Sequence, residues 1–216
     1  MSSSEAHAHN PHLAHHFDTI EKQDHAVRLG MWLFLATELL LFGGLFVAYG
    51  VYRYLYSDTF KAASTLIETH WGALNTVVLI SSSLTVALAH HEAEHGSPRK
   101  AGWLLLGSVL AGFIFLGVKS VEYGHHFHEG HLPGRFYSYA ALQAPGDSMF
   151  WTLYFLMTGL HGIHVVIGMV VLAWLGIECL RGKFAAGYAT PVELGGLYWH
   201  LVDLIWIFLF PLFYLI

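Results

Sequence analysis

The chain has 216 residues, of which 55% are hydrophobic and 12% are charged, and its formal net charge is −5. Soluble domains carry about 25% charged residues, so this composition excludes an ordinary soluble domain and indicates an integral membrane protein. The sequence has no basic run, which argues against a nucleic-acid partner, and its single cysteine, Cys179, excludes an internal disulfide.

Residues 1–27 are polar and are expected to form a tail outside the membrane domain. They have no basic segment followed by an apolar core, which argues against a cleavable signal. The tail is rich in histidine, at His7, His9, His12, His15, His16 and His25. Such a tract is a candidate for metal binding, but a solvated tail without a ligand explains it more simply, and no metal site is assigned to this chain.

Five apolar stretches follow, and each is long enough to cross a bilayer as a helix, because a hydrocarbon core of about 30 Å requires about 20 residues. They span about 30–52, 71–90, 102–122, 148–177 and 197–216. Their length and the lack of polar alternation exclude strands. The expected fold is all-α, with one membrane domain of five transmembrane helices over residues 28–216 and only short connections.

The flanking Lys and Arg residues predict the orientation of these helices. The N-terminal side carries six of them, at Lys22, Arg28, Arg99, Lys100, Arg181 and Lys183. The opposite side carries four, at Arg53, Lys61, Lys119 and Arg135. This bias predicts an N-terminus inside and, with five crossings, a C-terminus outside.

Glu38 lies within the first apolar stretch, where a carboxylate costs about 2.5–3.5 kcal/mol on insertion scales. It is interpreted either as a proton-handling group or as a neutral carboxyl that bonds to a neighbouring helix. A small channel or transporter that uses Glu38 as its ion site is an alternative for the whole chain. Whether Glu38 handles protons or bonds to a neighbouring helix, its side chain is expected to face the protein and not the lipid.

His161 and His164 are three residues apart, so they share one face of the fourth span. They are candidates for a metal or haem ligand pair, although a polar patch that bonds across helices is the favoured interpretation. Gly159, Gly162 and Gly168 lie nearby, and small residues allow another helix to approach closely.

His200 and Asp203 have the same spacing in the fifth span, and Glu193 lies two helical turns before His200. They are predicted to take part in helix packing and in contact with lipid headgroups near the cytoplasmic side, with a proton relay as the alternative. Arg181 and Lys183 follow the fourth span at the membrane surface. They are placed to bind lipid phosphates, and the alternative is that they act only as charges that set the topology.

Histidines also gather after the third span, at His125, His126, His128 and His131. That density suits copper or zinc, but loop histidines without a scaffold more often bind no metal. A membrane di-iron enzyme would need to combine three groups of histidines, namely His12-x-x-His15-His16, His91-x-x-x-His95 and His128-x-x-His131. The expected crossings place the third group on the opposite side from the first two, which argues against this rival.

Four blocks in order resemble subunit III of the haem-copper cytochrome c oxidases over about residues 28–216. They are GMWLFLATELLLF with its membrane Glu38, LNTVVLISSSLTVALAHH at 74–91, TGLHGIHVVIG at 158–168 and ELGGLYWHLVDLIWIFLFPL from Glu193. SVEYGHHF at 120–127 is a weaker match, through Glu122 and Tyr123.

The resemblance implies an accessory, non-catalytic subunit without haem or copper of its own, which packs against catalytic subunit I and other oxidase subunits that hold those cofactors. It implies bound phospholipid, support of proton uptake, and a carbodiimide-reactive carboxylate at Glu38. A multi-pass protein of a bacterial plasma membrane is expected rather than one of the mitochondrial inner membrane.

The longer form of the family has two further helices with no counterpart here, and Val47 replaces a tryptophan usual in that form. Short forms also occur in quinol oxidases, and a related branch is associated with nitric oxide reductases, so the electron donor stays open.

Overall fold

The computed structural model describes residues 13–139, 146–184 and 188–215. Within these ranges the chain forms helices and connections without a strand. The helices are α1 (Ile20–Leu55), α2 (Ser57–Ser64), α3 (Thr69–Glu94), α4 (Pro98–His128), α5 (Asp147–Leu180) and α6 (Thr190–Tyr214), with one 3₁₀ turn, η1 (Gly134–Phe136). Five of the helices are long and apolar enough to cross a membrane, so the predicted all-α architecture with five spans is confirmed.

The helices extend beyond the apolar stretches that predicted them. α1 has 36 residues, or about 54 Å at 1.5 Å per residue, and it begins at Ile20, ten residues before the predicted span. Thr19 caps this end, because its hydroxyl accepts a hydrogen bond from the Lys22 amide at 3.3 Å, and Glu21 complements the helix dipole. Hydropathy marks only the part of a helix that lies in lipid, so polar turns at its ends go undetected. His7, His9 and His12 lie outside the described residues.

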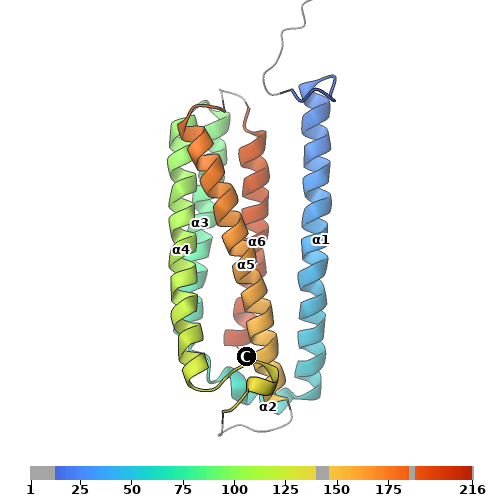
Figure 1. The fold of residues 1–216 in the computed structure, drawn as a ribbon, viewed down its shortest axis with the longest axis vertical. Coiled ribbons are helices and arrows are strands. Elements are labelled where there is room, and N and C mark those ends of the chain that lie inside the picture. Colours follow the sequence, from blue (N-terminus) through green and yellow to red (C-terminus); the bar gives the residue numbers. More distant parts are fainter. Residues whose placement is uncertain (1–12, 140–145, 185–187, 216) are drawn as a thin grey trace, which may run out of the picture.

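The short helix α2 occupies a segment that the sequence analysis treated as a loop. Its Phe60 is fully buried and packs edge-to-face on Tyr49 of α1 and Phe150 of α5, with ring centroids 5.6 and 5.3 Å apart. α2 therefore links α1 to the start of α5 at one end of the molecule (Figure 1).

Four long helices, α3 to α6, pack as a bundle, and α1 stands beside this bundle against α5 and α6 (Figure 1). The start of α1, the α3–α4 turn, the end of α5 and the start of α6 lie at one end. α2, the end of α4, the start of α5 and the C-terminal end of α6 lie at the other (Figure 1). We call the first the N-terminal end and the second the C-terminal end.

Trp199 of α6 lies at the centre of the bundle and is fully buried. Its indole N–H donates to the Ser82 hydroxyl of α3 at 3.0 Å, and its ring covers Gly168 of α5, where an added Cβ would lie 2.7 Å from it. The predicted close approach therefore occurs at Gly168. Added Cβ atoms at Gly159 and Gly162 would find their nearest neighbours at 3.8 and 4.0 Å, which is ordinary contact.

Candidate functional site

Glu38 of α1 and His164 of α5 meet between the two helices. A Glu38 carboxylate oxygen lies 2.8 Å from Nε2 of His164, and the two side chains are 16% and 11% exposed. The ring of Phe42, one helical turn after Glu38, packs against the imidazole at 5.2 Å. The carboxyl therefore bonds to a neighbouring helix, as one of the two sequence interpretations required.

The hydrogen bonds of His164 determine how many protons the pair holds. Nδ1 lies 2.8 Å from the Leu160 carbonyl oxygen, and because a carbonyl only accepts, Nδ1 carries a hydrogen. The contact between Nε2 and Glu38 then needs a second hydrogen, either on the carboxyl or on Nε2. In both arrangements the pair is neutral overall and holds one proton that can pass between two atoms 2.8 Å apart.

His161 lies apart from this pair although it is only three residues away. It is fully buried between Phe115 of α4 and Trp206 of α6, with ring centroids 5.6 and 5.4 Å from its own. Neither of its ring nitrogens has a hydrogen-bond partner among the described residues. His161 and His164 thus turn toward different neighbours, and the structure does not bring them together as ligands of one metal or haem.

The polar residues of α6 contact α3 and α1. His200 Nδ1 lies 2.6 Å from the Ser83 hydroxyl of α3, and the buried Asp203 carboxyl lies beside the same serine. Glu193 accepts hydrogen bonds from Arg28 of α1, at 2.8 Å from Nη2 and 3.2 Å from Nε. These contacts join α6 to α3 and α1, and the packing role of the three residues stays a prediction.

Arg181 and Lys183 share one carboxylate at the end of α5. Their side-chain nitrogens lie 3.1 and 2.8 Å from the two oxygens of Glu178. Two cations and one anion leave this cluster with a net charge of +1, and the cationic side chains stay largely exposed.

An apolar groove of about 370 Å³ runs between α1 and the bundle. Its walls come from α1, α5 and α6, through Met31, Phe34, Ile167, Val171, Trp174, Leu175, Pro191, Leu194, Gly195 and Tyr198. Trp174 lies seven residues before Arg181, which is nearly two full turns. The Arg181 and Lys183 cluster therefore follows the groove wall toward the N-terminal end of the molecule.

The structure contains a buried charged network that the sequence predictions do not include, because Lys119 lies near the end of a span and resembles an outer flanking charge. The structure instead buries Lys119 of α4, with its ammonium 3.2 Å from Glu122 and 2.9 Å from the hydroxyls of Tyr154 and Tyr214. Both hydroxyls donate to Glu122. The signal was present, since opposite charges three residues apart beside an apolar stretch commonly pair on one helix face.

The histidines at the end of α4 fall into two groups. His125 and His128 are exposed, whereas His126 and His131 are buried against Trp151 of α5. Burial lowers the pKa of the His131 imidazole, and the nearby Glu129 carboxylate partly offsets this effect.

The di-iron alternative fails on distance. His91 and His95 lie at the end of α3, whereas His128 and His131 lie at the far end of α4. α4 has 31 residues and is about 46 Å long, so one di-iron site cannot include both groups.

Comparison with known proteins agrees with this arrangement. Residues 8–216 match the family described as cytochrome c oxidase subunit III. The chain is 32% identical to quinol oxidase subunit 3 of Bacillus spizizenii over 189 residues, which cover 87% of this chain and 85% of the relative. It is 28% identical to the probable quinol oxidase subunit 3 of Staphylococcus epidermidis, covering 94% of this chain and 97% of the relative.

A longer animal relative also matches. The chain is 30% identical to cytochrome c oxidase subunit 3 of Coturnix japonica over 213 residues, covering 93% of this chain but 72% of the relative. The similarity to bacterial quinol oxidase subunits is consistent with a bacterial membrane location, and the five apolar helices indicate a multi-pass membrane protein. The chain belongs to the cytochrome c oxidase subunit III family, whose members are accessory subunits of haem-copper oxidase complexes.

Proposed function

We propose that this chain packs against catalytic subunit I of its oxidase, holds a phospholipid, and supports proton uptake through Glu38. The reduction of oxygen takes place in the partner, which supplies the haem and copper, and this chain contributes none. The observation that supports the proposal is the 2.8 Å contact between Glu38 and His164, with Nδ1 of His164 bonded to the Leu160 carbonyl, inside a membrane helix contact.

The pair is suited to proton exchange because no net charge changes inside the membrane when the proton moves between its two atoms. An isolated carboxylate in lipid would cost several kcal/mol, and the bond to His164 removes that cost. Glu38 also stays 16% exposed, so a proton or a small reagent reaches it from the surface of α1.

Glu38→Gln and Glu38→Ala separate packing from proton exchange. A glutamine amide still donates to Nε2 of neutral His164 but holds no transferable proton, whereas alanine removes both functions. We expect Glu38→Gln to assemble normally yet lose activity sooner during sustained turnover, and Glu38→Ala to show the same loss with weaker assembly. Single-turnover oxygen reduction should be unchanged in both.

The measurement is the decay of oxygen consumption by the purified complex, with Glu21→Gln as the control because Glu21 is exposed at the start of α1. A Glu38→Gln complex with a wild-type active lifetime would contradict the proton-uptake role and leave only packing.

We further propose that a phospholipid acyl chain occupies the groove between α1 and the bundle, with the phosphate at Arg181 and Lys183. The groove walls are apolar, and the cationic cluster of net charge +1 lies beyond them at the expected membrane surface. Phosphate oxygens accept charge-assisted hydrogen bonds from such side chains.

Filling the groove tests this placement. Val171 lines the groove, and its neighbour Val170 does not and is largely exposed. Val171→Trp should lower the phospholipid retained per purified complex by about one molecule, as counted by mass spectrometry of extracted lipid, while Val170→Trp should retain the wild-type amount. Equal retention in both variants would place the lipid elsewhere.

The distribution of flanking cations supports an N-terminus inside. Because Lys119 is buried in the bundle, it no longer counts as a flanking cation of the outer side. The N-terminal side then carries six Lys and Arg residues and the opposite side carries three.

A further inference from the structure

The turn that ends α4 gathers His126, Glu129 and His131. Glu129 is the C-cap of the helix, and Gly130 follows with φ of +86°, a conformation that favours glycine. The His131 amide donates to the His126 carbonyl at 3.0 Å, and the Gly130 amide donates to the Phe127 carbonyl at 3.3 Å. These two bonds form a Schellman motif, which brings together the side chains of the third residue before the cap and the second residue after it. In most helices that contact is hydrophobic, and here both residues are histidines.

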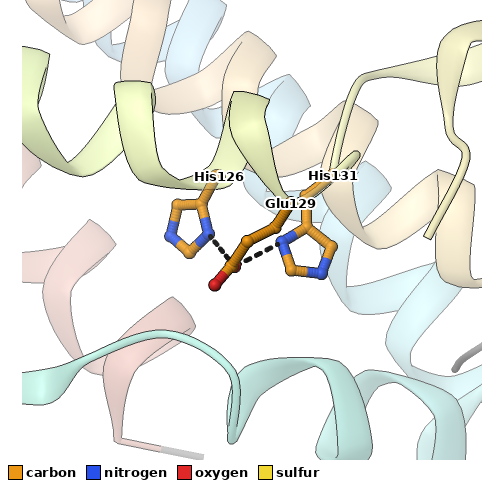
Figure 2. A group of neighbouring side chains, drawn as sticks. All are labelled: His126, Glu129 and His131. Atoms are coloured by element: carbon orange, nitrogen blue, oxygen red, sulfur yellow. Dashed lines mark ion pairs between the residues drawn. The ribbon is translucent and has the colours of Figure 1, made fainter.

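Both imidazoles are buried, and each has a ring nitrogen without a hydrogen-bond partner among the described residues. His126 and His131 are 4% and 1% exposed, and Nδ1 of each ring has no hydrogen-bond partner in the described part of the chain. The Glu129 carboxylate lies between the rings, 3.9 Å from Nδ1 of His126 and 3.3 Å from Nδ1 of His131 (Figure 2). A buried polar atom without a partner costs about 1–3 kcal/mol, so this arrangement calls for a further ligand.

Neighbouring aromatic side chains hold the rings in place. His131 stacks on Trp151 with a centroid distance of 4.2 Å and an angle of 10°, and Tyr139 covers it at 4.2 Å. His126 packs on the same tryptophan at 4.8 Å. Glu129 is half exposed, so the group can be approached from solvent on its side.

We propose that His126, Glu129 and His131 bind one divalent transition metal ion of the zinc class. The ligand atoms of the three residues all lie within 4.8 Å of one another. Zinc–nitrogen and zinc–oxygen bonds of about 2.0–2.2 Å place tetrahedral ligands about 3.4 Å apart. The Glu129 oxygen already lies 3.9 and 3.3 Å from the two Nδ1 atoms, so binding of the ion mainly requires the two imidazoles to move closer together. Two imidazoles and one carboxylate select zinc over the hard cations Mg²⁺ and Ca²⁺, which take oxygen ligands.

The site has room for water to complete the coordination. A cavity of about 40 Å³ borders His126 and Glu129, which is enough for at least one water. The carboxylates of Glu68 and Glu122 also line this cavity and add negative charge beside the ion. The bound ion would fix the α4–α5 connection against α5, at the C-terminal end of the molecule.

The test is zinc binding by the intact oxidase complex, purified through a tag without histidines and stripped with a chelator. Glu129→Gln is the main variant, because Glu129 is half exposed and its change leaves the buried rings in place. His128→Gln is the matched control, since His128 lies one position earlier and is exposed. The histidine-rich tail is present in all three proteins, so its contribution cancels in the comparison.

We expect Glu129→Gln to bind one zinc fewer per complex than the wild type at micromolar free zinc, or to bind that ion at least tenfold more weakly. His128→Gln should match the wild type, and millimolar Mg²⁺ should not displace the ion. X-ray absorption at the zinc edge should lose an oxygen ligand in Glu129→Gln and retain the two imidazoles. Equal zinc binding by the wild type and Glu129→Gln, or an equal loss in His128→Gln, would overturn the proposal.

Discussion

The ion pair of Lys119 and Glu122 is held entirely by side chains of the bundle, including the hydroxyls of Tyr154 and Tyr214. Removing one partner of a buried pair leaves an uncompensated charge, which typically costs about 3–5 kcal/mol. We therefore expect Lys119→Met to lower the thermal unfolding temperature of the complex markedly.

Two comparisons test this explanation. Lys61→Met removes an exposed lysine and should leave the unfolding temperature unchanged. The double change of Lys119→Met with Glu122→Gln should be less damaging than Lys119→Met alone, because no charge then remains unpaired. A double variant as unstable as the sum of the single variants would argue against a paired charge.

The two membrane carboxyls should differ in reactivity. Glu38 is partly exposed on α1 and hydrogen-bonds to His164, whereas Glu122 is 3% exposed, accepts two hydrogen bonds from tyrosine hydroxyls and forms an ion pair with Lys119. Carbodiimides react with protonated carboxyls, so a lipid-soluble carbodiimide should label Glu38 and spare Glu122. Peptide mapping by mass spectrometry provides the measurement, and labelling of Glu122 alone would contradict the assigned surroundings.

At the scale of elements, the contact of α5 with α6 depends on the absence of a side chain at Gly168. A methyl group there would lie 2.7 Å from the Trp199 ring, and overpacking of this kind costs about 1–3 kcal/mol. Gly162→Ala is the control, since the nearest atom to its added Cβ lies 4.0 Å away. We expect Gly168→Ala to unfold at a lower temperature than Gly162→Ala, and the reverse order would show that the close approach is misplaced.

The sequence was sufficient to predict the five spans, because a helix in lipid must be apolar over about 20 residues. It was insufficient for the helix ends, where capping residues such as Thr19 extend a helix through polar turns. It also missed α2, whose eight residues carry too few apolar side chains for a periodic signal, and whose burial depends on Tyr49 and Phe150 from other helices.

The candidate site was predictable only in part, for a similar reason. The cost of a carboxylate in lipid singled out Glu38, and helical spacing singled out His164. Neither signal indicates that these two residues contact each other. The separation of His161 from His164 depends on where α1, α4 and α6 pack around α5, and that information is tertiary. Lys119 was misassigned because its position near the end of a span resembles a flanking charge.

At the scale of the whole molecule, the proposed orientation makes a direct labelling prediction. Asp58 in α2 and Lys100 in α4 lie at opposite ends of the molecule, and the native Cys179 is buried, so background labelling should be low. A maleimide that cannot cross membranes should label Asp58→Cys in intact cells, and Lys100→Cys only after the membrane is permeabilised. The opposite pattern would invert the topology.

α1 also exposes a large apolar surface, with Trp32, Leu40, Val47 and Tyr54 each more than 60% exposed. In a membrane this surface contacts lipid or another subunit. Because the family consists of oxidase subunits, this surface is a candidate interface with another subunit of the complex. The central claim is therefore that this chain resides in a haem protein complex although it supplies no haem itself.

The most direct measurement is mild detergent extraction of the tagged chain, followed by an optical spectrum and mass analysis of the proteins that accompany it. We predict reduced haem bands together with a large polytopic partner in fixed stoichiometry. A chain that purifies alone without haem, under conditions that keep other membrane complexes intact, would contradict the account.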